Sequence, residues 1–228
     1  MNVLIPALKD INNVKGYTVK QWDLLTKQAR SENLLGRLYY LLEKSNNFQF
    51  MPPPLSWHYE SAYKVAERQR RNALREAFEI SKLLNKNQIK PTFIKGCAYA
   101  ISSVPVAYGR LMADIDVLVQ KSEITTSENS LFSGGWLLSK IESYDEEYYR
   151  KWMHEIPPLK HAMRQTTLDL HHNILPLTNK HNLDSKKLIK HAIKKDFVGD
   201  CYILADTDMV IHSAVHLFTE SEFHSAIR

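Results

Sequence analysis

Two apolar stretches of this chain carry aspartates where a buried strand would carry aliphatic side chains. In DIDVLV, Asp114 and Asp116 are separated by one residue, and in TTLDLHH, Asp169 stands between two leucines. Because strand side chains alternate between faces, Asp114 and Asp116 are expected on the same face. Burying an unpaired carboxylate costs several kcal/mol, and two carboxylates repel each other. Either positive charge lies beside them, or the first stretch is not a buried strand.

The three acids together are suited to binding a cation. At a rise of roughly 3.3 Å per residue, Asp114 and Asp116 lie about 7 Å apart along a strand and can share a divalent cation or a pair of cations. Mg²⁺ prefers one or two carboxylates together with substrate phosphates. Asp169 would join from a neighbouring strand, on the face of Thr167 and His171. Such a two-metal site stabilises the attacking and leaving oxygens of a displacement at phosphorus.

A strand followed by Lys-Gly and a helix predicts the phosphate-binding half of the site. A helix that begins at Gly96 offers unpaired N–H groups and the positive end of its dipole to a phosphate. The absence of a side chain at Gly96 would let the phosphate approach the backbone. Lys95 and Arg110 can balance phosphate charge, and Arg110 is close to Asp114 in the sequence.

These residues, FIKG…YGRLMADIDVLV…LDLHH, resemble the nucleotidyltransferase superfamily of the DNA polymerase beta type. They are most similar to an uncharacterised bacterial family with a KG…R…DIDLLV core and a later DLHW. The resemblance covers most of the chain. It implies an α/β (α+β) fold, with a small mixed sheet flanked by helices and mainly helical terminal regions. It also implies transfer of a nucleoside monophosphate from an NTP to an acceptor, with release of pyrophosphate.

The resemblance implies roles for individual residues as well. Asp114 and Asp116 would hold Mg²⁺ or Mn²⁺, with Asp169 as the third ligand and the general base for the acceptor hydroxyl. Gly96 would line the triphosphate, assisted by Lys95 and Arg110. The chain departs from the family pattern at two positions, with Cys97 where the superfamily usually has Ser and His172 where the family has Trp.

Three functions are compatible with this pattern. The first is a metal-dependent nucleotidyltransferase acting on a small molecule, a protein hydroxyl or an RNA end. The second is a non-catalytic, antitoxin-like interaction protein that keeps the fold, and the third is a related kinase. Retention of three mutually repelling acids argues for a working site. His212 and His216, spaced i, i+4, and His171, on the face of Asp169, are weighed as metal ligands, and packing is the favoured interpretation for the first two.

Hydrophobic periodicity divides the chain into a helical region over 1–90, an α/β core over 91–175 and a helical region over 176–228. The resemblance implies that the central region is the nucleotidyltransferase core. The first region predicts two helices within 18–44, broken near 31–36, then a spacer at MPPPL and a long helix over 55–87. The core predicts strands over 91–95, 114–120, 136–140 and a pair within 160–172, with helices over 96–103 and 122–129. The last region predicts helices over SKKLIKHAIKK and from residue 206 onward.

Composition excludes several classes of protein. The chain is 44% hydrophobic with a formal net charge of +5, which is ordinary for a globular protein and too small an excess to indicate DNA binding. Its seven glycines form no Gly-rich phosphate loop, and Cys97 and Cys201 are expected as free buried thiols. No stretch predicts a signal peptide or a membrane span, so a cytoplasmic protein is expected. The helical pattern that reaches Arg228 without a glycine cap predicts a longer natural chain or a partner that completes the fold.

Overall fold

The computed structural model describes residues 1–139, 142–180, 184–196 and 200–219. These residues form two compact units. The first contains Met1–Arg71 and Val104–Met112, and the second contains Asn72–Ser103 and the described residues from 113 onward. The long helix α4 contributes its first part to the first unit and its last part to the second.

The first unit is helical. Its elements are α1 (Leu4–Lys9), η1 (Ile11–Gly16), α2 (Val19–Ser31), α3 (Leu35–Lys44), η2 (Phe48–Phe50), the start of α4 (Pro53–Asn85) and η3 (Pro105–Ala107). Thr18 begins α2 with a capping box, in which its side chain accepts from the Gln21 backbone and the Gln21 side chain accepts from the Thr18 backbone. Trp22, Leu38 and Tyr59 are fully buried between these helices. The predicted pair of helices with a break near 31–36 is therefore confirmed.

The sequence predicted a spacer at the proline run MPPPL, and this prediction is wrong. Pro53 begins α4, which continues without interruption to Asn85. Proline is well tolerated in the first turn of a helix, because the N–H that it lacks would have no partner there and its φ is already close to the helical value. The long helix predicted over 55–87 is confirmed.

The second unit is built on a mixed sheet. Its seven described strands are β1 (Thr92–Ile94), β2 (Asp114–Leu118), β3 (Trp136–Leu138), β4 (Leu159–His161), β5 (Thr167–His171), β6 (Ile193–Lys195) and β7 (Cys201–Ile203), in the order β3-β4-β5-β2-β1-β7-β6. The pairs β2–β5 and β1–β7 are parallel, and the other neighbours are antiparallel. The expected mixed α/β fold is confirmed.

Two predicted elements are wrong in part. In HAMRQ, His161 ends β4 and the following residues turn toward β5, with Gln165 at a φ of 60°. In SKKLIKHAIKK, α8 covers only Ser185–Lys190, and Ile193–Lys195 forms β6 against β7, a strand that the sequence did not predict. Pairing with a distant segment overrides local helical preference at this edge of the sheet. Lys140 and residues 220–228, the ends of two predicted elements, lie outside the described residues.

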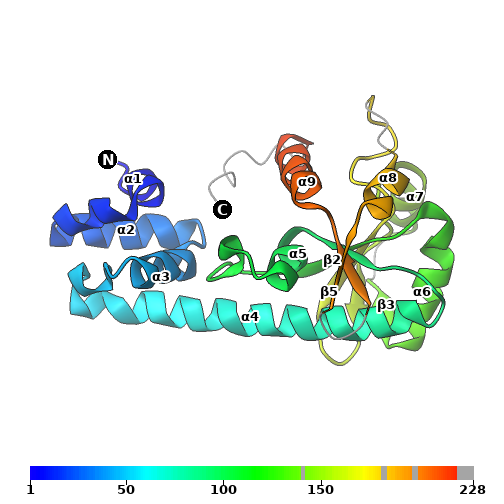
Figure 1. Ribbon diagram of the computed structural model, residues 1–228, viewed down its shortest axis with the longest axis horizontal. Coiled ribbons are helices and arrows are strands. Elements are labelled where there is room, and N and C mark those ends of the chain that lie inside the picture. The colour runs from blue at the N-terminus through cyan, green and yellow to red at the C-terminus, as the bar shows by residue number, and fades with distance from the viewer. Residues whose placement is uncertain (140–141, 181–183, 197–199, 220–228) are drawn as a thin grey trace. The chain divides into compact units, whose positions relative to one another are not determined.

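Helices cover the sheet of the second unit on two sides. They are α5 (Lys95–Ser102), η4 (Lys121–Glu123), α6 (Ile124–Ser133), α7 (Ser143–Trp152), α8 and α9 (Asp206–Thr219). In Figure 1, α5 and α6 lie on opposite sides of the strands, and α9 lies on the side of α5. The hydroxyl groups of Tyr99 in α5 and Ser213 in α9 form a hydrogen bond with each other. Cys97 and Cys201 are buried and form no disulfide with each other, as expected. No helix in the described part of the chain is both long and apolar enough to cross a bilayer.

Candidate active site

Strands β2 and β5 bring two of the predicted acids side by side. In their parallel register, Asp116 is the partner of Asp169, and Asp114 is the partner of Thr167. Residues paired in this way lie about 4.8 Å apart across the sheet with their side chains on the same face. Asp114 joins that face two residues before Asp116. The register thus places Asp114, Asp116 and Asp169 on one face of the two central strands.

Asp116 is buried and is contacted by an ammonium group and by an imidazole. Its side chain is 2% exposed, and its Oδ1 lies 2.9 Å from Lys95 Nζ and 3.0 Å from His171 Nε2. Burial opposes its ionisation, but the hydrogen bond from His171 and the charge of Lys95 outweigh burial and lower the pKa of Asp116 to about 2. Lys95 therefore supplies positive charge to the buried Asp116, and His171 supplies a hydrogen bond.

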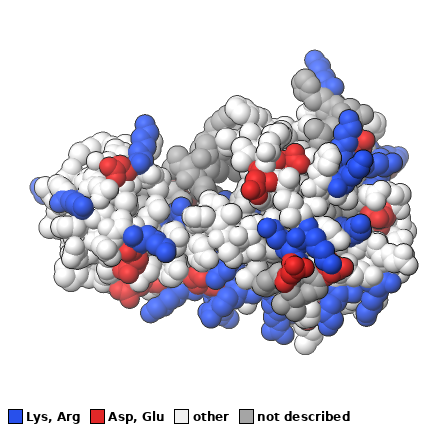
Figure 2. Space-filling view, in the orientation of Figure 1, with Lys and Arg blue, Asp and Glu red and all other residues white. Residues whose placement is uncertain are grey.

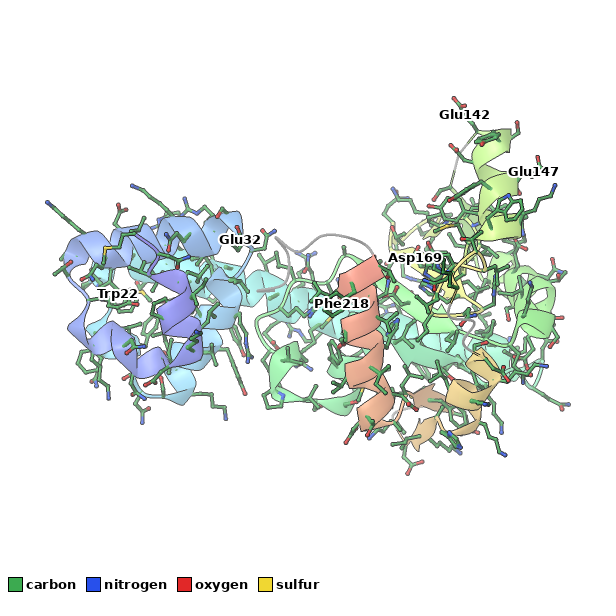
Figure 3. All side chains as sticks on the ribbon, turned by 90° about the horizontal axis from the view of Figure 1, so that it is seen from above. Trp22, Glu32, Glu142, Glu147, Asp169 and Phe218 are labelled. Carbon is green, nitrogen blue, oxygen red and sulfur yellow. The ribbon has the colours of Figure 1, made fainter. Side chains whose placement is uncertain are left out.

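Asp169 has the opposite environment. Its Oδ1 is buried and, among the described residues, has no hydrogen-bond partner. Burial, together with the neighbouring charges of Asp116 and Glu155, raises the pKa of Asp169 to about 7. Figure 3 shows Asp169 among the crowded side chains of the second unit, whereas Glu142 and Glu147 at α7 point outward.

Asp114 is the most accessible of the three acids. It is exposed at the start of β2. Burial of its carboxyl and the charge of Asp116 raise its pKa, against the charge of Lys95. An accessible acid beside a buried orphaned carboxylate oxygen is a donor set that suits a hard divalent cation, which takes oxygen ligands.

The helix α5 begins directly at the acids. Lys95, its first residue, has a φ of 50°, a left-handed conformation that costs a residue with a side chain roughly 1–2 kcal/mol. Ile94, just before it, pairs with Asp116. Gly96 and Cys97 follow in the first turn, where backbone N–H groups have no partner within the helix. Cys97 is buried, with its Sγ 3.9 Å from the carbonyl oxygen of Ala73.

Arg110 belongs to the other unit. It lies in the segment Val104–Met112 of the first unit, four residues before Asp114 in the sequence. Its predicted action on a phosphate therefore stays a prediction.

The segment before β4 adds site residues that the sequence pattern did not predict. The β4–β5 register pairs Leu159 with Leu168, and counting onward would place Ile156 opposite His171. The structure instead pairs Glu155 with His171. Pro157 and Pro158 lie between these two registers, and proline cannot donate to a strand ladder.

This one-residue shift decides which side chain faces the acids. A slip of one residue moves a strand's side chains to the opposite face. The shift turns Glu155 to the face of Asp169 and His171 and leaves Ile156 buried. In the sequence, only the pair Pro157–Pro158 indicates this shift in register.

Histidines gather around the same site. His154 precedes Glu155, His172 follows His171, and His212 lies on α9, where it is buried. Burial lowers the pKa of His154 and His212 to about 3 and that of His172 to about 4. These three imidazoles are therefore uncharged at neutral pH. The distance in sequence between α9 and the acids explains why His212 was assigned only to packing.

One of three comparisons with known proteins finds a match. A family model described as an uncharacterised nucleotidyltransferase matches residues 18–228. No curated protein and no solved structure matches the chain.

Proposed function

This chain belongs to the uncharacterised nucleotidyltransferase family, and from that premise we propose that it transfers a nucleoside monophosphate from an NTP to a hydroxyl acceptor, releasing pyrophosphate. The observation that carries the proposal is the pairing of Asp116 with Asp169, on the same face as Asp114 and next to the N-terminus of α5. Acids gathered beside unpaired helix N–H groups combine a cation site with a phosphate site.

The donor set fits Mg²⁺ or Mn²⁺. A bound cation would give the buried, unpartnered Oδ1 of Asp169 a partner, and Asp114 is open to solvent. We propose that Asp114, Asp116 and Asp169 hold the metal. When bound, the metal supplies positive charge to the triphosphate and to the oxygens at the reacting phosphorus.

The chain's own groups bind the donor and move the proton. The N–H groups of Gly96 and its neighbours would donate to the triphosphate. Lys95 holds Asp116 ionised through their 2.9 Å contact and would bring its ammonium group close to the phosphates. Asp169, whose pKa is raised to about 7, would accept the proton of the acceptor hydroxyl as its oxygen attacks the α-phosphorus.

Three classes of acceptor are compatible with this reaction: a small molecule, a protein hydroxyl and an RNA end. On the face seen in Figure 2, the Lys and Arg side chains of the second unit are interspersed with Asp and Glu instead of forming one continuous basic stripe. A continuous stripe is the usual footprint of a nucleic-acid partner. The small-molecule and protein acceptors are therefore tested first.

The test is calorimetric titration of each NTP, with Mg²⁺, into the wild-type chain and into a double variant, Asp114→Asn with Asp116→Asn. We expect one NTP to bind in a Mg²⁺-dependent manner, with at least tenfold weaker binding in the double variant. The matched control is Asp23→Asn, which removes an exposed carboxylate of α2 and leaves binding unchanged.

A second readout follows turnover. Pyrophosphate release from the preferred NTP, measured with candidate acceptors, should disappear in Asp169→Asn, whereas NTP binding should weaken less than in the double variant because Asp114 and Asp116 remain as ligands. Failure of every NTP to bind, or binding indifferent to Mg²⁺ and to both aspartates, would favour the non-catalytic, antitoxin-like alternative.

A further inference from the structure

A cluster of side chains next to the three acids differs from them in chemistry. His154, Glu155 and His171 each offer one ligand atom, and the three atoms lie within 4.8 Å of one another. His171 is 1% exposed, and Glu155 Oε2 lies 3.3 Å from its Nδ1. Two imidazoles and one carboxylate are typical ligands of Zn²⁺ and related transition ions, whereas Mg²⁺ takes oxygen ligands.

The backbone holds these three residues in place. The His154 carbonyl accepts hydrogen bonds from the backbone of His172 at 2.8 Å and of Asn173 at 3.1 Å. Glu155 bridges to His171, and the Ile156 N–H donates to the Leu170 carbonyl at 3.1 Å. The segment that carries two of the ligands is thus fastened to the end of β5, which carries the third.

Hydrogen bonding assigns the tautomer of His171. An ionised Asp116 can only accept, so the 3.0 Å contact requires His171 Nε2 to carry the proton. A neutral ring then has a lone pair at Nδ1, and this atom is buried without a hydrogen-bond partner among the described residues. A histidine that ligates a metal typically donates its other N–H to a carboxylate in this way.

A second orphaned nitrogen points to a metal and not to a proton. A proton on His171 Nδ1 would join it to Glu155, but it would leave His154 unsatisfied. In the described part of the chain, His154 Nδ1 is also buried and has no hydrogen-bond partner. A cation bound through the Nδ1 atoms of both histidines would give each orphaned nitrogen a partner.

We propose that His154, Glu155 and His171 form a second metal site, for a transition ion of the Zn²⁺ class, linked to the aspartates through the His171–Asp116 hydrogen bond. Ligands of a tetrahedral ion with bonds of about 2.0–2.2 Å stand about 3.4 Å apart, so the three side chains would close in slightly on binding. Three protein ligands leave a fourth position for water or for substrate.

Zinc titration without nucleotide tests the proposal, and its outcome is independent of transferase activity. The full chain is freed of metal with a chelator and titrated with Zn²⁺ in excess Mg²⁺, which occupies the carboxylate site. We expect one equivalent of Zn²⁺ to bind. We expect the affinity to fall at least tenfold in His154→Gln and in Glu155→Gln. The matched control, His191→Gln, removes an exposed histidine after α8 and leaves the affinity within twofold.

Cobalt gives a second readout. Co²⁺ in a site with two imidazoles should produce visible absorption bands that disappear in His154→Gln. Thermal unfolding of each metal-free variant checks that it is folded, and Glu155→Gln serves alone if His154→Gln is not. Absence of Zn²⁺ binding to the wild-type chain, or binding that both variants retain, would overturn the proposal.

Discussion

Asp116 and Asp169 are register partners in the parallel pairing of β2 and β5, yet their carboxyl groups have opposite pKa shifts. Lys95 and His171 hold the pKa of Asp116 at about 2, against the effect of its burial. Burial and the charges of Asp116 and Glu155 raise the pKa of Asp169 to about 7. One carboxylate of the pair is thus stabilised by the protein, and the other is left for a ligand or a proton. The opposite pKa shifts of these two carboxyl groups can each be tested.

Asp169→Asn should stabilise the metal-free protein at pH 8 by roughly 1–3 kcal/mol. The folded pKa of Asp169 is raised from 3.8 to about 7, so the wild-type protein loses stability as the pH rises from about 4 to 7 and the buried group ionises. The amide of the variant cannot ionise, so the variant does not lose this stability as the pH rises. Urea unfolding at pH 4 and pH 8, in a chelator, measures the difference. An equal effect at both pH values would contradict the assigned shift.

Binding of Mg²⁺ or Mn²⁺ should release a proton. The cation needs an ionised Asp169, so its affinity should rise about tenfold between pH 6 and pH 8 and level off above pH 8. Calorimetry in two buffers of different ionisation enthalpy reports both the affinity and the protons released. Equal affinity at pH 6 and pH 8 would place the cation away from Asp169.

Lys95→Gln should lower the free energy of unfolding at pH 7 by roughly 2–3 kcal/mol. The change removes the cation beside a buried carboxylate and leaves only the hydrogen bond from His171. The low pKa of Asp116 stabilises the fold above about pH 4, and this contribution is lost as the pH falls toward 2. In the variant the loss should begin at a higher pH. Lys86→Gln, at an exposed position of the chain, is the control for urea titrations at pH 7 and pH 4.

Gly109→Ala should destabilise the first unit by at least about 2 kcal/mol. Gly109 has a φ of 72°, and a Cβ there would lie 2.2 Å from the Gly36 carbonyl oxygen. Relief would need movement of backbone, which packing resists. Gly16→Ala is the matched control, because no atom lies within 4 Å of its added Cβ. Calorimetric melting compares the two, and equal melting temperatures would mean that the loop and α3 separate freely.

Parts of the site that depend on local pattern were predictable. The alternation of Asp114 and Asp116 with aliphatic residues indicated β2, and the strand–Lys–Gly order indicated that a helix begins beside them. The break between α2 and α3 and the course of α4 followed from apolar spacing. Partners that come from distant segments were not predictable: β6 and β7 were missed, because each is three residues long and is stabilised by the strand beside it.

The amino-acid sequence by itself determined which faces are apolar and the courses of α2, α3, α4 and β2, because these depend on side-chain periodicity over a few residues. Only the tertiary structure decided that Asp169 stands beside Asp116, and that Lys95 and His171 contact Asp116. It also decided that Glu155, and not Ile156, pairs with His171. The physical reason is that strand register is set by hydrogen bonds between segments far apart in the chain, and a shift of one residue reverses which side chains face the site.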